Sequence, residues 1–433
     1  MLDRIVDILE KTDNVKRSSY TWNAIASFVL ALQSPILLMV VTRTTGVYDA
    51  GVYSIAVAVA NLLLYVGQYG LRRYQSSDVL ESFRFDEYHG MRVITCGAMV
   101  LVSAMYCVYG MLYRDYTPDK FLVIFLWCML KVIHAYSDVL HGRMQQKGRL
   151  DVATKSSTTR YIAEMITYIA ALVVTRNLLT STLACLIVSV IVMMLTSFNA
   201  ARRYCDSLKP AFACDRLKKL MIEGAPLFFS MFLNMYVGNA PKYAIDSCLT
   251  DEVQAVFNMI FMPAFVIQLV SHFIFNPILT TYAELWIAEE RGKLAKLKGL
   301  VKKMCMVVLG LTVLALAVAA TIALPILSLW FGTDLGGYKA EICIIMLGGG
   351  MLAYATYFST VAAVFRIQRS LFVCYGVVSL MAAAMSARLV SGYGLIGASA
   401  LYAVLMTLLA VSLGAVVFRT LKKEEVLLAN GKK

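Results

Sequence analysis

Charged residues are scarce in this chain. Asp, Glu, Lys and Arg make up 15% of its 433 residues, whereas 60% of the residues are hydrophobic. Ordinary soluble proteins carry about a quarter charged residues, so a soluble globular fold is excluded and an all-α integral membrane protein is predicted. Because each helical span needs about 20 residues, the spans leave no room for a separate soluble domain.

Metal and redox motifs are also missing. The four histidines form no HExxH set, and the ten cysteines contain no CxxC pair or other metal-ligand spacing. Neither a disulfide framework, a zinc site, a resident cofactor nor an enzyme activity is therefore expected. The glycine run 348–350 is not followed by Lys-Ser/Thr, so it is interpreted as a place where helices approach closely or bend rather than as a phosphate-binding loop.

Most of the sequence consists of long apolar segments. Hydropathy predicts twelve spans of about the length that crosses a bilayer. They cover residues 19–42, 51–71, 91–112, 121–140, 152–174, 179–200, 224–249, 253–282, 304–330, 341–365, 371–388 and 393–417.

The basic residues fall mainly on one side of these spans. With the amino terminus inside, the inner segments and span ends hold 32 of the 40 basic residues, the outer loops hold six, and Lys131 and Lys242 are left in the membrane. The six are Arg43, Arg114, Lys120, Arg176, Lys339 and Arg388. This bias predicts that both termini are cytoplasmic. It also accounts for the net charge of +13 without a nucleic-acid partner.

A basic stretch in mid-chain divides the spans six and six. We expect an N-terminal lobe at 1–201, a cytoplasmic linker at 202–223, and a C-terminal lobe with a cytoplasmic tail at 224–433. A shift of 204 residues lays 51–55 on the similar sequence 255–259. This echo, with the same order of inner and outer turns in each half, favours two similarly oriented six-helix lobes.

One stretch places a charge within a predicted span. Residues 234–246, NMYVGNAPKYAID, put Lys242 beside Pro241 between apolar segments, and the Asn-Ala-Pro triplet is expected to break the helix. A lysine in hydrocarbon usually faces a bundle interior or a watery cavity, which makes Lys242 a candidate binding residue. The alternative is that Lys242 snorkels to the outer interface.

The fourth predicted span carries a second group of polar residues. Lys131, His134 and Asp138 are spaced three and four apart, so they share one helix face. Glu164 lies at similar depth in the fifth span, four residues from Arg160. We hypothesise that Lys131 pairs with Glu164 and that His134 or Asp138 moves a proton. The alternative is a fixed ion pair that joins two helices.

These features together resemble a known family. The twelve spans, the short outer loops, the basic mid-chain stretch and the sequence Asn239-Ala240-Pro241-Lys242-Tyr243 resemble the polysaccharide flippases. These belong to the multidrug/oligosaccharidyl-lipid/polysaccharide exporter (MOP) superfamily. The Gly142-Arg143-Met144-Gln145 turn, with Arg149 following, is similar to inner turns in that family. The resemblance covers nearly the whole chain.

The resemblance implies a V-shaped transporter of two six-helix lobes around a cationic central cavity. Such a flippase would move undecaprenyl-pyrophosphate-linked oligosaccharide, of an O-antigen or teichoic type, across the bacterial plasma membrane by alternating access during cell-surface polysaccharide biosynthesis. The expected substrate-binding residues are Lys242, Arg43, Asn239, Asn234, Gln33 and Asn61. Expected partners are the lipid-linked oligosaccharide, membrane lipids, and a glycan polymerase or glycosyltransferases. Sodium ion and proton both stay open as the coupling ion.

Two other functions compete with this interpretation. A cation-coupled multidrug exporter of the same superfamily is similar in fold, but the first span has Gln33 as its main polar group and no clear acidic cluster. A membrane-bound glycan polymerase or ligase should carry a large outer loop with acid-base or arginine residues, and the outer loops predicted here are short.

Overall fold

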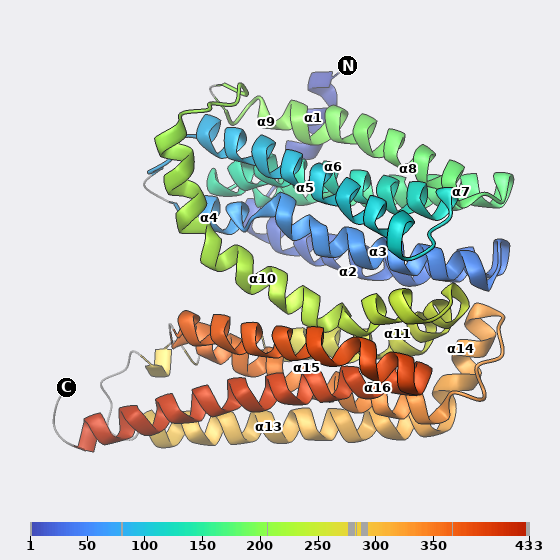
Figure 1. The fold of residues 1–433 in the computed structure, drawn as a ribbon. Coiled ribbons are helices and arrows are strands. Elements are labelled where there is room, and N and C mark those ends of the chain that lie inside the picture. Colours follow the sequence, from blue (N-terminus) through green and yellow to red (C-terminus); the bar gives the residue numbers. More distant parts are fainter. Residues whose placement is uncertain are drawn as a thin grey trace. The chain divides into compact units, whose positions relative to one another are not determined.

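The structure is a computed structural model of the whole chain (Figure 1). It describes residues 2–78, 81–205, 207–275, 282, 284–286, 293–365 and 367–429. Within these ranges the chain is helical and contains no strand. Nine of the described helices are long and apolar enough to cross a membrane.

The chain divides into two compact units, Met1–Phe232 and Leu233–Lys433. The first unit begins with α1 (Leu2–Glu10) and continues with ten further helical segments. These are α2 (Val15–Thr44), α3 (Val47–Gln68), α4 (Leu71–Ser77), α5 (Phe85–Tyr113), α6 (Pro118–Gln146), α7 (Leu150–Thr175), α8 (Leu178–Met193), η1 (Met194–Phe198), α9 (Asn199–Ala201) and the first part of α10 (Cys214–Cys248).

Helix α6 lies at the centre of the first unit, where it packs against α3, α5, α7 and α8. Its sequence suits that place, because buried side chains occur around much of its circumference, including Trp127, Leu130 and Ala135. A helix that is buried on several faces needs apolar or paired side chains on all of them. The polar residues of α6 must therefore find partners within the unit.

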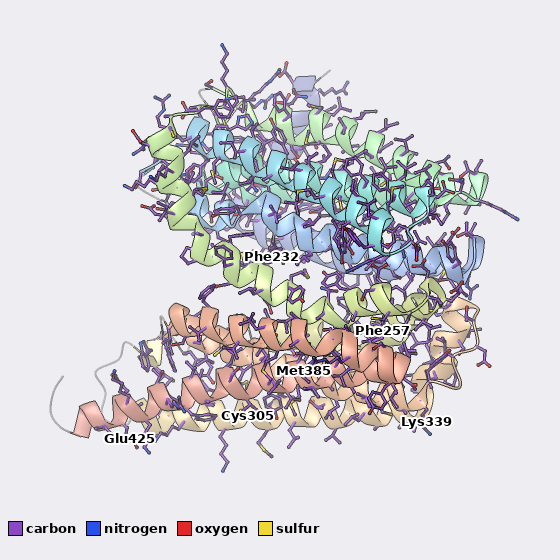
Figure 2. The ribbon with its side chains drawn as sticks, in the orientation of Figure 1. Phe232, Phe257, Cys305, Lys339, Met385 and Glu425 are labelled. Carbon is purple, nitrogen blue, oxygen red and sulfur yellow. The ribbon has the colours of Figure 1, made fainter. Side chains whose placement is uncertain are left out.

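Helix α10 belongs to both units, since the boundary at Phe232 falls inside it (Figure 2). The helix runs without interruption through the Asn239-Ala240-Pro241 triplet, so the expected break is wrong. Proline removes one backbone donor, and membrane helices accommodate this loss through neighbouring groups. The residues expected as a linker, 202–223, are assigned to the first unit, and α10 begins among them at Cys214.

The second unit contains the rest of α10 and, among the helices whose bounds the structure describes, six further segments. These are α11 (Asp251–Phe275), α13 (Lys293–Val318), η2 (Ala319–Ala323), α14 (Leu324–Phe331), α15 (Lys339–Val364) and α16 (Gln368–Ala429). Helix α15 is central here, because it packs against α11, α13 and α16. The central helix of each unit thus corresponds to the fourth predicted span of its half.

Three consecutive glycines let the neighbours of α15 approach closely. A Cβ on Gly348 would lie 2.5 Å from the Tyr402 ring of α16, and one on Gly349 would lie 3.2 Å from Ile267 of α11. A Cβ on Gly350 would collide with Thr312 of α13. Successive helix positions point about 100° apart, so each glycine serves a different neighbour. The run 348–350 therefore permits close helix approach.

Helix α16 is two helices joined at one residue. Its 62 residues stay helical except at Gly394, which has φ +57° and ψ −135°. A straight helix of that length would extend about 90 Å, roughly three times the hydrocarbon thickness. Gly394 therefore separates the eleventh span from the twelfth, and glycine suits this left-handed conformation because it has no Cβ.

The predicted fold class is confirmed. The twelve expected spans correspond to α2, α3, α5, α6, α7, α8 with its η1 and α9 extension, α10, α11, α13 with η2 and α14, α15, and the two arms of α16. The end of the expected span 253–282 and the final residues 430–433 fall outside the described ranges, except for Tyr282. The protein is a multi-pass, all-α membrane protein.

The first turn of α10 is tied to α5 by Glu87. Its two carboxylate oxygens accept hydrogen bonds from Arg216 Nε at 2.7 Å and Nη2 at 3.1 Å, and the backbone N–H of Arg84 donates to it at 2.8 Å. Arg216 also donates to the Ser82 carbonyl. The hydrogen bonds from Arg216 lower the pKa of Glu87, which lies before the third predicted span. The ionised carboxylate is therefore the form that the fold favours.

We expect Glu87→Gln to lower the free energy of unfolding at pH 7 by about 1 kcal/mol. A lowered pKa means that the stabilisation is full above the ordinary glutamate pKa of about 4.3 and is lost as the pH falls through the lower pKa of the folded protein. Thermal unfolding at pH 7 and near pH 3 checks this. Glu425→Gln removes an exposed ion pair with Lys298 and should change little. An equal difference between wild type and Glu87→Gln at both pH values would contradict the assignment.

Candidate functional site

Glu164 of α7 is the centre of a buried polar cluster in the first unit. Its side chain is 0% exposed, and its carboxylate lies 2.9 Å from His134 Nε2 of α6. Ser189 of α8 donates to it at 2.6 Å, and Gln33 of α2 donates at 3.4 Å. Arg160 Nε, one turn earlier on α7, is 3.6 Å away. Four helices therefore supply groups to one carboxylate.

Lys131 lies close to this cluster without a direct ion pair. It is 6% exposed and lies three residues before His134 on α6. Among the residues that the structure describes, no carboxylate lies within 4.0 Å of its ammonium. The expected direct pair between Lys131 and Glu164 is therefore not the arrangement found, because His134, Ser189, Gln33 and Arg160 supply the close contacts of Glu164.

Asp138 belongs to a different cluster, although it shares a helix face with His134. Its carboxylate pairs with Arg92 of α5 at 3.1 Å and with Arg72 of α4 at 3.2 Å. Arg92 is fully buried and also donates to the carbonyl of Gly67 at the end of α3. The four positions of α6 that separate His134 from Asp138 are enough for the two side chains to meet different neighbours.

Two of the three remaining candidates of the first unit lie apart from these clusters. Gln33 is buried and belongs to the Glu164 cluster. Asn61 is half-buried on α3, and Arg43 is exposed in the last turn of α2. The structure thus brings Gln33, His134 and Glu164 together and leaves Asn61 and Arg43 elsewhere.

Lys242 is buried in the second unit beside aromatic rings. It is 6% exposed, and its Nζ lies 5.0 Å from the ring centroid of Phe261 and 5.7 Å from that of Phe265. Both rings belong to α11 and lie four residues apart, on one face of that helix. Within the described ranges no carboxylate pairs with Lys242. An ammonium over two rings is stabilised by the negative ring faces, so the charge has favourable contacts but no counter-ion among the described residues.

The two asparagines near Lys242 differ in exposure. Asn234 is exposed, whereas Asn239 is half-buried and donates to the Met235 carbonyl one turn earlier on the same helix at 3.1 Å. Asn239 therefore satisfies part of its hydrogen-bonding capacity locally. Lys242 is a buried charged residue of this stretch, and its ammonium has no hydrogen bond or ion pair within the described part of the chain.

Several residues of these clusters were missed in the sequence. Arg92 and Arg160 are among the 32 basic residues assigned to the inner segments and span ends, yet both are almost fully buried. Their positions within the predicted spans 91–112 and 152–174 were the available signal. Nothing in the sequence indicates Ser189, Phe261 or Phe265, because their contacts depend on how neighbouring helices are aligned.

The fold matches solved structures. No protein-family profile and no curated protein matches the sequence. An inward-facing multidrug resistance MATE family transporter of the MOP superfamily aligns over 95% of this chain and 99% of its own, with a TM-score of 0.67 and 12% identity. The lipid II flippase MurJ, in an inward closed conformation, aligns over 91% of this chain and 87% of its own, with a TM-score of 0.66 and 14% identity. The chain has the MATE and MurJ fold.

A third solved structure with the MATE and MurJ fold is described by its binding pocket. It is a MOP superfamily transporter from Pyrococcus furiosus, described by the reverse polarity of its binding pocket, which suggests a different function for it. It aligns over 98% of both chains with a TM-score of 0.57 and 12% identity. Proteins that share the MATE and MurJ fold thus include a multidrug transporter and a lipid flippase. The function of this chain has to be argued from its own charges.

Proposed function

We propose that the protein is a flippase that moves an undecaprenyl-pyrophosphate-linked oligosaccharide across the bacterial plasma membrane by alternating access. The observation that carries the proposal is Lys242, a buried ammonium without a carboxylate partner in the described chain. An unpaired charge in a membrane protein is costly and generally serves a function. An anionic substrate would supply the missing counter-ion.

A buried lysine such as Lys242 suits the transport of a lipid with an anionic head group. An undecaprenyl-linked sugar has a polyprenyl tail that can remain in the bilayer and a charged head that hydrocarbon excludes. Lysine binds phosphate as a point charge and does not require one fixed geometry, so it can also release the head on the other side. The MATE and MurJ fold is compatible with this task, since MurJ is described as a lipid II flippase.

The charge balance of the first unit supports the same class of substrate. In its two buried clusters the cations Lys131, Arg92 and Arg160 outnumber the carboxylates Asp138 and Glu164. An exporter of cationic drugs would be expected to offer unpaired carboxylates instead. Both carboxylates here are paired with arginine.

The proposal predicts a loss of transport in Lys242→Met. In a strain that lacks the gene, lipid-linked oligosaccharide should accumulate and surface polysaccharide should fall, and the wild-type gene should reverse both changes. Lys242→Met should reduce the flux by about 10- to 100-fold, because a hydrogen-bonded charge contributes about 1.5–3 kcal/mol. Lys242→Arg should retain transport, since arginine is also cationic and stacks on aromatic rings. The amount of lipid-linked oligosaccharide on each membrane face is the measurement.

The same strains test the competing function. A cation-coupled multidrug exporter has specific support from the match to a multidrug resistance MATE family transporter. Its signature would be drug sensitivity of the deletion strain with normal surface glycan, and that result would overturn the flippase proposal. Immunoblotting of membranes controls for the protein level of each variant.

A further inference from the structure

The Lys242 ammonium depends on one aromatic ring more than on any other. Phe261 lies closer to Nζ than Phe265 does, at 5.0 Å against 5.7 Å between Nζ and the ring centroids. A cation is attracted to the ring face only within about 6 Å. The orientation of Phe261 therefore matters for where the ammonium is held.

Tyr402, in the second arm of α16, packs against the Phe261 ring. Its ring meets Phe261 edge to face, with centroids 4.7 Å apart and planes at 72°. Tyr402 is 0% exposed, and its hydroxyl has no hydrogen-bond partner in the described chain. Phe257, labelled in Figure 2, packs on Phe261 from one turn away, at 5.6 Å between centroids. Tyr402 thus acts on Phe261 through its ring rather than its hydroxyl.

Gly348 of α15 makes room for the Tyr402 ring. A Cβ at this position would lie 2.5 Å from Tyr402 Cδ1 and 3.1 Å from Ala403 Cα. The first contact is too short for any real Cβ, and the second involves backbone that cannot move easily. A side chain on Gly348 would therefore displace Tyr402. A chain of contacts runs from Gly348 through Tyr402 and Phe261 to Lys242, and each of the four residues lies on a different helix or arm.

We infer that Tyr402 and Gly348 are positioning residues for Lys242: they hold the Phe261 ring against the ammonium and so set the affinity for the pyrophosphate of the lipid-linked substrate. This inference rests on the proposed function. Without the ring contact the flexible lysine side chain would distribute among other rotamers. The anion would then have to order the side chain on binding, and its affinity would fall.

The test measures the preference for a charged lipid. Wild-type protein in nanodiscs is titrated with undecaprenyl pyrophosphate and, separately, with the uncharged alcohol undecaprenol, and the ratio of the two Kd values is the pyrophosphate preference. Tyr402→Leu should reduce this preference by about 3- to 30-fold, the range of a cation–π contact. Tyr402→Phe should leave it unchanged, because the hydroxyl has no partner in the described chain. A purely structural role of Tyr402 would change both Kd values together.

Two glycine variants form a matched pair for the same test. Gly348→Ala should reduce the pyrophosphate preference as Tyr402→Leu does, whereas Gly310→Ala should not, because a Cβ on Gly310 meets nothing within 4 Å. If Gly348→Ala fails to fold, the two Tyr402 variants still decide the question.

The outcomes separate the two proposals. A wild-type protein without any pyrophosphate preference would overturn the proposed function. A wild-type preference that Lys242→Met abolishes but Tyr402→Leu leaves intact would overturn the positioning role and keep the proposed function. Loss in Tyr402→Leu with retention in Tyr402→Phe would support the inference.

Discussion

Glu164→Gln should lower the free energy of unfolding by about 3–5 kcal/mol, the cost of removing one partner from a buried ion pair. Glutamine keeps the volume and can still accept the hydrogen bond from Ser189, so the change isolates the charge. It leaves the Arg160 guanidinium, 3.6 Å away, and the nearby Lys131 ammonium without an anion. Thermal unfolding in detergent and the protein level in membranes measure the effect.

Lys131→Met is the matched control for that prediction. Lys131 has no carboxylate within 4.0 Å in the described chain, so its removal leaves the contacts of Glu164 with Arg160 and His134 in place. We expect the free energy of unfolding to change by less than about 1 kcal/mol. Lost transport at a normal protein level would assign Lys131 to the transport cycle, and normal transport would assign it a structural role. Equal destabilisation by the two substitutions would contradict the geometry described for Glu164.

Asp138→Asn should lower the free energy of unfolding by about 3 kcal/mol. This is the largest effect expected after that of Glu164→Gln. Its carboxylate is the counter-ion of Arg92, whose side chain is 0% exposed and which also caps the Gly67 carbonyl at 2.6 Å. Asparagine would preserve one hydrogen bond but leave the guanidinium charge uncompensated. Because Arg72 is 31% exposed, its share of the pairing should be much smaller.

A double-mutant cycle separates the two arginines. The coupling energy between Asp138→Asn and Arg92→Gln should reach about 2–3 kcal/mol, and the coupling with Arg72→Gln should stay below about 1 kcal/mol. Both cycles use thermal or denaturant unfolding of the same purified protein. A larger coupling for Arg72 would show that the buried pair is not the one that stabilises this end of the unit.

The spans could be predicted from sequence because hydropathy and helix length need no knowledge of neighbouring helices. The shared face of Lys131, His134 and Asp138 was predicted for the same reason, since it follows from helix periodicity alone. Their partners could not be predicted. His134 meets Glu164 of α7, while Asp138 meets Arg92 of α5 and Arg72 of α4, and this division depends on which helices flank α6.

The contacts of Lys242 in the seventh span could not be predicted from the sequence either. The sequence identified Lys242 as an unusual charge but gave no sign of Phe261 and Phe265, because aromatic residues are common in apolar spans. The cation–π contacts require a particular alignment of α10 against α11. The continuous course of α10 through Pro241 was also missed, because the rule that proline ends a helix holds better in water than in a membrane bundle.

The single-residue junction at Gly394 affects how the protein can be cut and tagged. Proteases cleave exposed, extended loop tips, and the two arms of α16 remain helical up to either side of this residue. Limited digestion should therefore recover both arms in one fragment. An epitope inserted after Gly394 would need flexible spacers on both sides, since without them it would have to unwind the adjacent helical turns.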